Sequence, residues 1–145
     1  MAINNDKEFK TALSGLPDNK QRQVAARFVE SVLALSKDAR VKHAIDSVAQ
    51  TGLSDDELDA TYKSAKAASV DSFTRCGVEC NWSDQAGHFV AKAALACIAA
   101  GSDPAWDAAM YARMARTSES IATGKGTDNA ETAAQYRILE KYLEG

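Results

Sequence analysis

Proline and histidine are both scarce in this sequence, with two of each among 145 residues. Proline breaks the interior of a helix but is tolerated in its first turn. Both prolines, Pro17 and Pro104, stand where helical periodicity begins, so they indicate helix starts. The regular alternation of apolar and polar residues that is typical of strands is also missing. With so few imidazoles, a catalytic or metal site built on several histidines has little material.

A long apolar run is absent as well. The longest candidate, 89–100, is interrupted by Lys92, whereas a membrane span needs about 20 apolar residues. The first six residues, MAINND, have neither the basic nor the apolar region of a signal peptide. The three cysteines are an odd number, and nothing in the composition suggests an oxidising compartment. We therefore expect a cytoplasmic protein with reduced thiols and no membrane partner.

The net charge is small, at -3 from 17 basic and 20 acidic residues. Nucleic-acid binding needs a concentrated basic surface, so we expect no nucleic-acid partner. Hydrophobic residues make up 46% and charged residues 26%, which is ordinary for a globular protein that folds without a disulfide or a metal. We accordingly expect no cofactor. The mild acidity is compatible with a basic protein partner.

Apolar side chains recur every three or four residues through most of the chain, which predicts an all-α fold. We expect a single helical domain over residues 1–145, with six to seven helices in an antiparallel or orthogonal bundle. The expected helices are 6–13, 18–36, 37–49, 55–75, 84–100, 104–123 and a last helix after residue 128. The predicted core residues are Val24, Ala25, Phe28, Val29, Val32, Leu35, Val41, Ala44, Ile45, Val48, Leu58, Tyr62, Ala65, Phe73, Trp106, Met110, Met114, Ile121, Tyr136, Leu139 and Leu143.

Capping motifs support several of these helix starts. The segment 54–57, SDDE, is a capping box with acidic residues in the first turn. Ser83 is predicted to cap the following helix, and Asp128 is predicted to form a second capping box with Glu131. Most glycines stand near predicted helix ends, but Gly87 lies inside a predicted helix.

One group of residues could hold a metal or support thiol chemistry. Cys76 and Cys80 fall in a predicted interhelical turn, and Asp84 and His88 are four residues apart, so they share one face of the next helix. Cys97 should point away from His88. The Cys-x3-Cys-x7-His spacing differs from the usual zinc motifs, so we favour turn thiols, a histidine on a helix and a core cysteine, with no metal bound.

Two charged groups are candidates for partner binding. Arg113 and Arg116 line one strip of a helix, where they could hold an anion, meet a partner's carboxylates or pair within the chain. Asp55, Asp56 and Asp59 form the densest acidic group, which a basic partner would recognise although its first role is helix capping.

Several segments resemble the alanine-rich, all-α immunity proteins of the Imm5-like kind. The similarity is carried by KDAR at 37–40 leading into AID at 44–46, by GLSDDEL at 52–58, by the later alanine-rich helices and by AQYRILEKYL at 134–143. The segment 76–82 departs from that pattern. The resemblance implies a protein that binds and neutralises a partner toxin without catalysis of its own, and it assigns no catalytic residues.

We therefore expect a non-enzymatic helical protein-binding domain, with an immunity-type role as its specific form. A small metal- or thiol-dependent protein using Cys76, Cys80, Asp84 and His88 is one alternative. A structural homo-oligomer that packs alanine-rich faces between subunits is another. Trp82 and Trp106 could line a pocket, but the core is the expected place for both.

Overall fold

A computed structural model describes residues 2–50, 53–76, 81–98 and 103–145, with only the backbone described at 75 and 76. Within these ranges every regular element is helical, which confirms the all-α prediction. The α-helices are α1 (Asp6–Ser14), α2 (Asp18–Glu30), α3 (Ala39–Ala49), α4 (Asp55–Cys76), α5 (Trp82–Ile98), α6 (Pro104–Ala122) and α7 (Glu131–Glu144), and one 3-10 turn, η1 (Leu33–Leu35), follows α2. None of the helices in the described ranges is long and apolar enough to cross a membrane.

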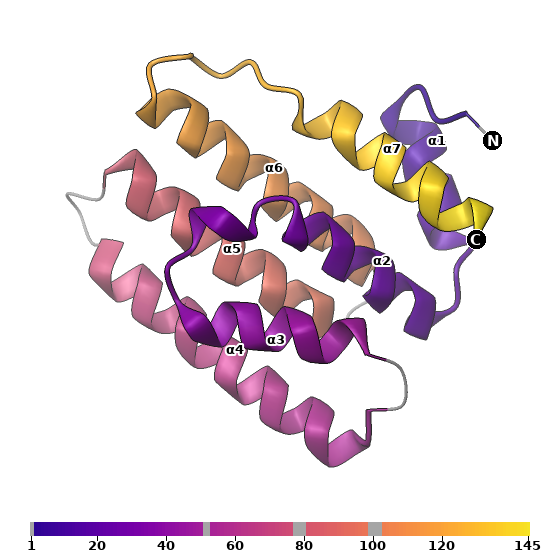
Figure 1. Cartoon of the computed structure of the whole chain (residues 1–145), viewed down its shortest axis with the longest axis horizontal. Coiled ribbons are helices and arrows are strands. Elements are labelled where there is room, and N and C mark those ends of the chain that lie inside the picture. The colour runs from indigo at the N-terminus through magenta and orange to yellow at the C-terminus, as the bar shows by residue number, and fades with distance from the viewer. Residues whose placement is uncertain (1, 51–52, 77–80, 99–102) are drawn as a thin grey trace.

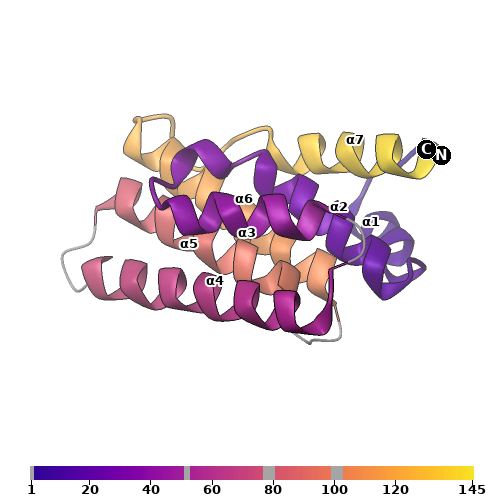
Figure 2. The ribbon, with the colours of Figure 1, turned by 60° about the horizontal axis from the view of Figure 1, so that its bottom comes forward.

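The helices pack in two layers (Figures 1 and 2). In one layer α4, α5 and α6 lie side by side and run antiparallel, and α5 makes the most extensive contacts with both neighbours. The other layer contains α3, α2 and α7, and α2 packs against both α5 and α6. Helix α1 and both chain termini lie together at one end of the molecule. The predicted bundle is therefore observed, with α5 at its centre.

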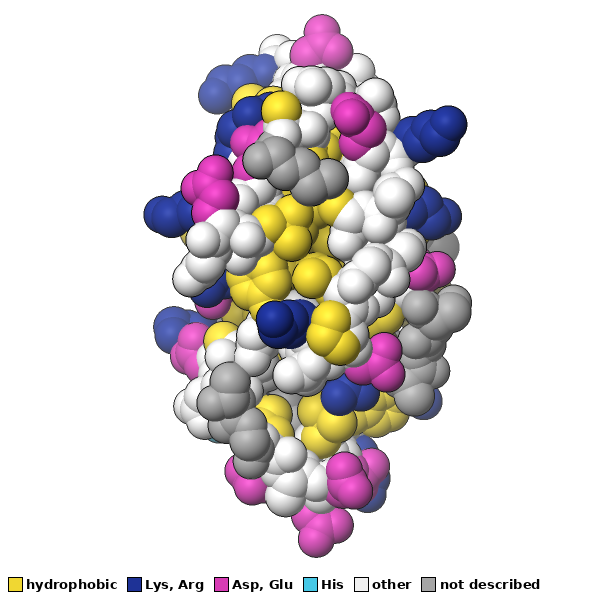
Figure 3. Space-filling view, turned by 90° about the vertical axis from the view of Figure 1, so that its right-hand side faces the viewer, with side chains coloured by type: hydrophobic (Ala, Val, Ile, Leu, Met, Phe, Trp, Pro, Cys, Tyr) yellow, Lys and Arg dark blue, Asp and Glu magenta, His cyan; other side chains and the backbone are white. Residues whose placement is uncertain are grey.

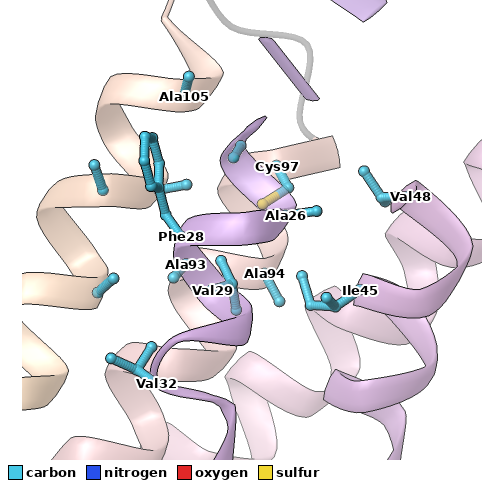
Figure 4. Packing of buried hydrophobic residues seen from close by; sticks show 14 of the residues in the cluster. Ala26, Phe28, Val29, Val32, Ile45, Val48, Ala93, Ala94, Cys97 and Ala105 are labelled. Atoms are coloured by element: carbon cyan, nitrogen blue, oxygen red, sulfur yellow. The ribbon is translucent and has the colours of Figure 1, made fainter. Parts of the chain in front are cut away.

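The core forms where the two layers meet (Figure 4). Val29 of α2 and Ile45 of α3 are fully buried against small residues of α5, and Phe28 of α2 is fully buried on the side of α6, next to Phe9. Cys97 of α5 is also fully buried in this cluster, as the sequence predicts. Burial in an apolar environment raises the pKa of its thiol, because the thiolate loses hydration there.

The contact between α5 and α6 is built from small side chains. The fully buried residues that α6 contributes to the core are all alanines: Ala105, Ala108, Ala109, Ala112 and Ala115. Alanine lets two helices approach closely, so the bulky residues of α6 lie on its other side. Met110, Trp106 and Ile121 are only partly buried, and Met114 is 48% exposed, so the predicted core position of Met114 is wrong. These alanines of α6 are thus buried within the chain, where they contact α5.

Two further core predictions are wrong. Phe73 is 68% exposed and Leu143 is exposed near the C-terminus. Residues Thr61, Ala65, Ala68 and Ser72 form the buried stripe of α4, so Phe73 falls on the neighbouring, solvent-facing side. Small residues again take the inner positions because α4 packs closely on α5.

Helix ends follow the local signals in part. The 54–57 capping box is confirmed, because the Glu57 backbone N–H donates to Ser54 Oγ at 3.1 Å. At the other two predicted caps an asparagine is the capping residue. Asn81, instead of Ser83, accepts a hydrogen bond from a backbone N–H in the first turn of α5. Asn129, instead of Asp128, accepts a hydrogen bond from the backbone N–H of Glu131. Because asparagine is an equally good cap, the sequence does not rank these neighbours.

The predicted helix 18–36 ends earlier, at Glu30, and continues as η1. Arg116 of α6 donates to the Ser31 carbonyl at 2.9 Å, which occupies an acceptor that a continuing helix would bond to a later backbone N–H. The shortened helix leaves residues 34–38 free to run across the ends of α4 and α5, where they form part of the site described next.

Candidate functional site

A cavity of about 400 Å³ lies between the segment 34–38, helix α4 and helix α5. Its apolar wall consists of small residues, mainly alanines of α4 and α5, and polar groups surround that wall. The cavity is lined by Ala34, Leu35, Ser36, Lys37, Asp38, Ala68, Ser72, Ser83, Asp84, Ala86, Gly87, His88, Ala91 and Glu119. Its volume falls in the range of small-molecule sites in proteins.

Gly87 explains how segment 34–38 comes so close to α5. A Cβ atom added at Gly87 would lie 3.4 Å from the Leu35 carbonyl oxygen, at the limit of ordinary contact. A larger side chain would push the segment away and change the cavity. An alanine would still fit there at ordinary contact distance, so the close approach excludes only side chains larger than alanine.

A buried hydrogen-bond chain joins α4 to α5 beside the cavity. Ser72 Oγ donates to the Ser69 carbonyl at 2.8 Å, and His88 Nδ1 lies 2.8 Å from the same Oγ atom. A serine hydroxyl has one hydrogen, so the bond to Ser69 favours a donating Nδ1–H on His88. In that tautomer Nε2 carries a lone pair and acts as an acceptor, and no hydrogen bond within the described residues uses it.

His88 is 8% exposed, and its environment favours the neutral ring. Burial lowers the pKa of His88, and the nearby positive charge of Lys92 lowers it further, while the Ser69 carbonyl opposes the shift. The ring also contacts the aromatic rings of Phe73 and Phe89, with centroid separations of 5.7 and 5.9 Å. His88 thus contributes a neutral imidazole to the cavity wall.

The charged groups around the cavity are mostly acidic. Three carboxylates, from Asp38, Asp84 and Glu119, line it together with one ammonium group, from Lys37. Asp38 is held by Arg40 at 2.7 Å, and Glu119 lies 3.6 Å from Arg116. These pairings fix the positions of two carboxylates without removing them from the cavity lining.

The predicted metal or thiol group is only partly within the described residues. Asp84 and His88 line the same cavity, in agreement with their predicted common face. The Cys76 side chain and all of Cys80 lie outside the described residues, so their relation to this cavity stays a prediction. Among the described residues, no three side chains of metal-binding type come together.

Arg113 and Arg116 make contacts within the chain. Arg113 donates to both carboxylate oxygens of Asp6, at 2.9 and 3.1 Å, and to Gln135 Oε1 at 2.8 Å. This guanidinium lowers the pKa of the Asp6 carboxyl, since it stabilises the ionised form. Arg116 lies 3.4 Å from the buried carboxylate of Glu131. Both arginines thus join α6 to neighbouring elements.

The acidic candidates Asp55, Asp56 and Asp59 are exposed at the start of α4. Asp59 pairs with Lys63 at 3.1 Å on the helix surface. Asp55 and Asp59 share a face of α4 with Tyr62, Val70 and Phe73, because these positions recur at helical spacing. This face carries negative charge at one end and apolar side chains at the other.

The apolar side chains continue across the neighbouring helices. Phe73 of α4 and Phe89 of α5 both contact His88, and Lys92 lies 5.4 Å from the ring centroid of Tyr111 on α6. Met114 is one turn beyond Tyr111. We call this set the outer aromatic face: Tyr62, Val70, Phe73, Phe89, Tyr111 and Met114. Figure 3 shows a separate apolar area at the end of the molecule where the termini lie.

The two tryptophans differ in their surroundings. Trp82 is exposed at the start of α5, so its predicted core position is wrong. Trp106 is partly buried, with its ring centroid 6.1 Å from that of Phe9. Neither tryptophan lines the cavity.

Most of the cavity, including Ser72, Ser36 and Lys37, could not be predicted from the sequence. The usable signals were weak: a glycine inside a helix at Gly87, and serine on the buried stripe of α4. Neither signal shows that residues 34–38 would reach α5. No family model, curated protein or solved structure matches this chain.

Proposed function

We propose that this chain is a non-enzymatic protein-binding domain that uses the outer aromatic face as its contact surface. The observation that carries the proposal is the exposure of large apolar side chains on that face, 68% for Phe73, 54% for Val70 and 48% for Met114. Exposed aromatic and methionine side chains that gather on one side of a molecule are typical of protein interfaces. Apolar residues scattered singly over a surface do not indicate an interface. On the outer aromatic face, ring contacts and helical spacing bring the apolar residues close to one another.

Charge suggests the kind of partner. The acidic residues Asp55, Asp56 and Asp59 lie at one end of α4, next to the apolar part of the outer aromatic face. Interfaces commonly combine an apolar centre with a charged rim, and complementary charge raises the association rate. We therefore infer a partner with an apolar patch beside basic residues. Arg113 and Arg116 do not belong to this surface, because both are engaged within the chain.

An immunity-type role is the specific form of this proposal. It is supported by the sequence resemblance described above and by the acidic end of α4. In that role the protein would bind a basic toxin domain and block it by coverage, which requires no catalytic residue in this chain.

The test first asks whether a gene adjacent to this one encodes a toxin-like protein, and then co-expresses that protein with the chain. We expect the parent chain to restore growth and to bind the purified toxin. Phe73→Glu and Met114→Glu should weaken binding at least about tenfold, since burying a charge at an interface centre costs more than 1.4 kcal/mol. Leu143→Glu is the matched control, because Leu143 is an exposed apolar residue on α7.

Equal binding by the parent, Phe73→Glu and Met114→Glu would contradict the assignment of this surface. A neighbouring gene whose product the chain neither binds nor neutralises would remove the immunity role. Light scattering tests the homo-oligomer alternative. If the parent chain is a dimer and Phe73→Glu is a monomer, the outer aromatic face joins two copies of this chain and does not bind a different partner.

A metal- or thiol-dependent site remains a second candidate, because Asp84 and His88 line one cavity. Elemental analysis of the purified protein tests it directly. A stoichiometric metal that is lost in His88→Gln would support this candidate. Metal-free protein whose properties are unchanged after alkylation of Cys76 and Cys80 would remove it.

A further inference from the structure

We propose that a second cavity, at the start of α2, binds a small monocarboxylate whose carboxylate group pairs with Arg22. This cavity has a volume of about 150 Å³ and lies where the start of α2, the end of α3 and the start of α4 meet. The start of α2 and the end of α3 lie at the same end of the bundle (Figure 1). The proposal goes beyond the protein-binding role, because no residue of the outer aromatic face lines this cavity.

The unpaired guanidinium group of Arg22 is the observation that carries the proposal. Arg22 is partly buried at the cavity, yet no hydrogen bond, ion pair or ring contact joins its side chain to another residue in the described part of the chain. Charged side chains that lose water on burial are normally paired. All five N–H donors of this guanidinium are therefore available to a ligand.

The other arginines show how unusual this is. Every other arginine whose side chain is described contacts a carboxylate or an aromatic ring: Arg27, Arg40, Arg113, Arg116 and Arg137. Arg22 thus differs from the arginines that join elements of the fold, and its position at a cavity gives it room for an external partner.

The remaining polar side chains of the cavity wall are neutral amides, from Asn19, Gln23 and Gln50. The Oε1 atom of Gln23 accepts from the Tyr142 hydroxyl at 2.9 Å, which leaves the amide N–H groups of Gln23 to donate. None of the described residues that line this cavity is acidic. A guanidinium beside amide donors is the complement of a carboxylate, which can accept two parallel N–H bonds from one arginine.

The rest of the wall selects the size of the ligand and its charge. Val48, Leu53 and Leu58 present carbon, so they favour a compact apolar group next to the carboxylate. A cavity of about 150 Å³ can hold a molecule the size of benzene. Asp55 and Asp56 are exposed within one turn of Leu58, so a second negative charge on the ligand would be repelled. Isovalerate and benzoate meet these conditions.

The experiment measures binding of isovalerate and benzoate to the full chain by calorimetry and NMR. The matched controls are isovaleramide and isoamylamine, which keep the alkyl group but are neutral and positively charged. We expect only the acids to bind and to shift the Nε–Hε resonance of Arg22, with an affinity that falls as salt rises. N-acetylleucine separates two sources of the same chemistry: tighter binding than isovalerate assigns the site to the carboxyl end of a peptide, and weaker binding assigns it to a free acid.

Variants of two arginines on one helix locate the site. Arg22→Gln should weaken isovalerate binding about tenfold, a change equivalent to 1.4 kcal/mol. Arg27→Gln is the matched control and should leave the affinity unchanged, because Arg27 is exposed on α2 and does not line the cavity. Arg22→Lys keeps the charge but loses the planar pair of donors, so its affinity should lie between those of the parent and Arg22→Gln. Circular dichroism checks that each variant keeps its helices.

Three results would overturn the proposal: equal affinity for isovalerate and isovaleramide, unchanged affinity in Arg22→Gln, or an equal loss in Arg27→Gln. Asp18 supplies a fourth, because it is an exposed acid one turn before Arg22 on α2. A tenfold gain of affinity in Asp18→Asn would show that Asp18 already occupies the guanidinium in solution. Failure of this proposal leaves the protein-binding proposal intact, because Phe73→Glu is expected to leave isovalerate binding unchanged.

Discussion

Gln135 is a buried polar residue whose replacement should cost more stability than any surface change. It is fully buried on α7, where its Nε2 donates to the Ala109 carbonyl at 2.9 Å and its Oε1 accepts from Arg113 Nε at 2.8 Å. These two bonds attach α7 to α6. We predict that Gln135→Ala lowers the free energy of unfolding by about 3.5 kcal/mol.

That magnitude follows from three losses. The neutral bond to Ala109 contributes about 1 kcal/mol, and the bond from the charged Arg113 contributes about 1.5 kcal/mol. We take the lower end for Arg113 because its guanidinium keeps both bonds to Asp6. The lost side-chain volume adds about 1 kcal/mol if the neighbours relax partly. For a chain of this size the melting temperature should fall by about 10 °C.

The assay is urea unfolding followed by circular dichroism, with two further variants. Gln135→Leu keeps most of the volume but neither bond, so it should lose about 2.5 kcal/mol. Gln23→Ala is the matched control, because Gln23 is partly exposed and makes one bond, from the Tyr142 hydroxyl at 2.9 Å. We expect that variant to lose less than about 1 kcal/mol. Wild-type stability in Gln135→Leu, or equal losses in Gln135→Ala and Gln23→Ala, would refute the reasoning.

Three other predictions concern α5. The folded state holds the pKa of His88 below its unfolded value, so the contribution of the neutral ring to stability is fully present above about pH 6.5 and is lost as the pH falls toward the folded pKa. His88→Gln should flatten this pH dependence of the unfolding free energy, measured by urea titrations between about pH 7 and 5. An unchanged slope in the variant would contradict the prediction. Gly87→Val should destabilise the protein by about 1–3 kcal/mol because the Leu35 carbonyl blocks its side chain, whereas Gly87→Ala should cost little, and the two melting temperatures decide the point. Cys97, buried and with a raised pKa, should resist iodoacetamide until the chain unfolds, as peptide mass mapping can show, and native-state labelling would disprove its burial.

Local signals explain why much of the fold is predictable. The capping box at 54–57 and the prolines at 17 and 104 act within a few residues, so they mark helix starts whatever the rest of the chain does. Apolar residues at helical spacing likewise predict the start of α2 and the course of α3, and Phe28 and Ile45 are fully buried as predicted. Where an asparagine competes as a cap with a nearby serine or aspartate, as Asn81 does with Ser83, the sequence alone indicates no preference.

The orientation of α4 and α6 required the structure. On α6 the hydrophobic pattern favours burial of the bulky stripe with Met110 and Met114, yet the alanine stripe is buried. The small alanine side chains let α6 approach α5 closely, and this close approach brings more atoms of the two helices into van der Waals contact. Phe73 on α4 is exposed for the same reason. Hydrophobicity alone cannot choose between two stripes when the smaller one fits a neighbour better.

The sequence by itself determined the helical class, most helix starts and the face shared by Asp84 and His88, since each depends on residues within one or two turns. Tertiary structure decided the rest: the Ser72–His88 bond across two helices, the Arg113–Asp6 pair that joins α6 to α1, and the cavity closed by residues 34–38. Such contacts depend on how far apart two packed helices lie, and that distance is set jointly by many side chains from remote parts of the chain.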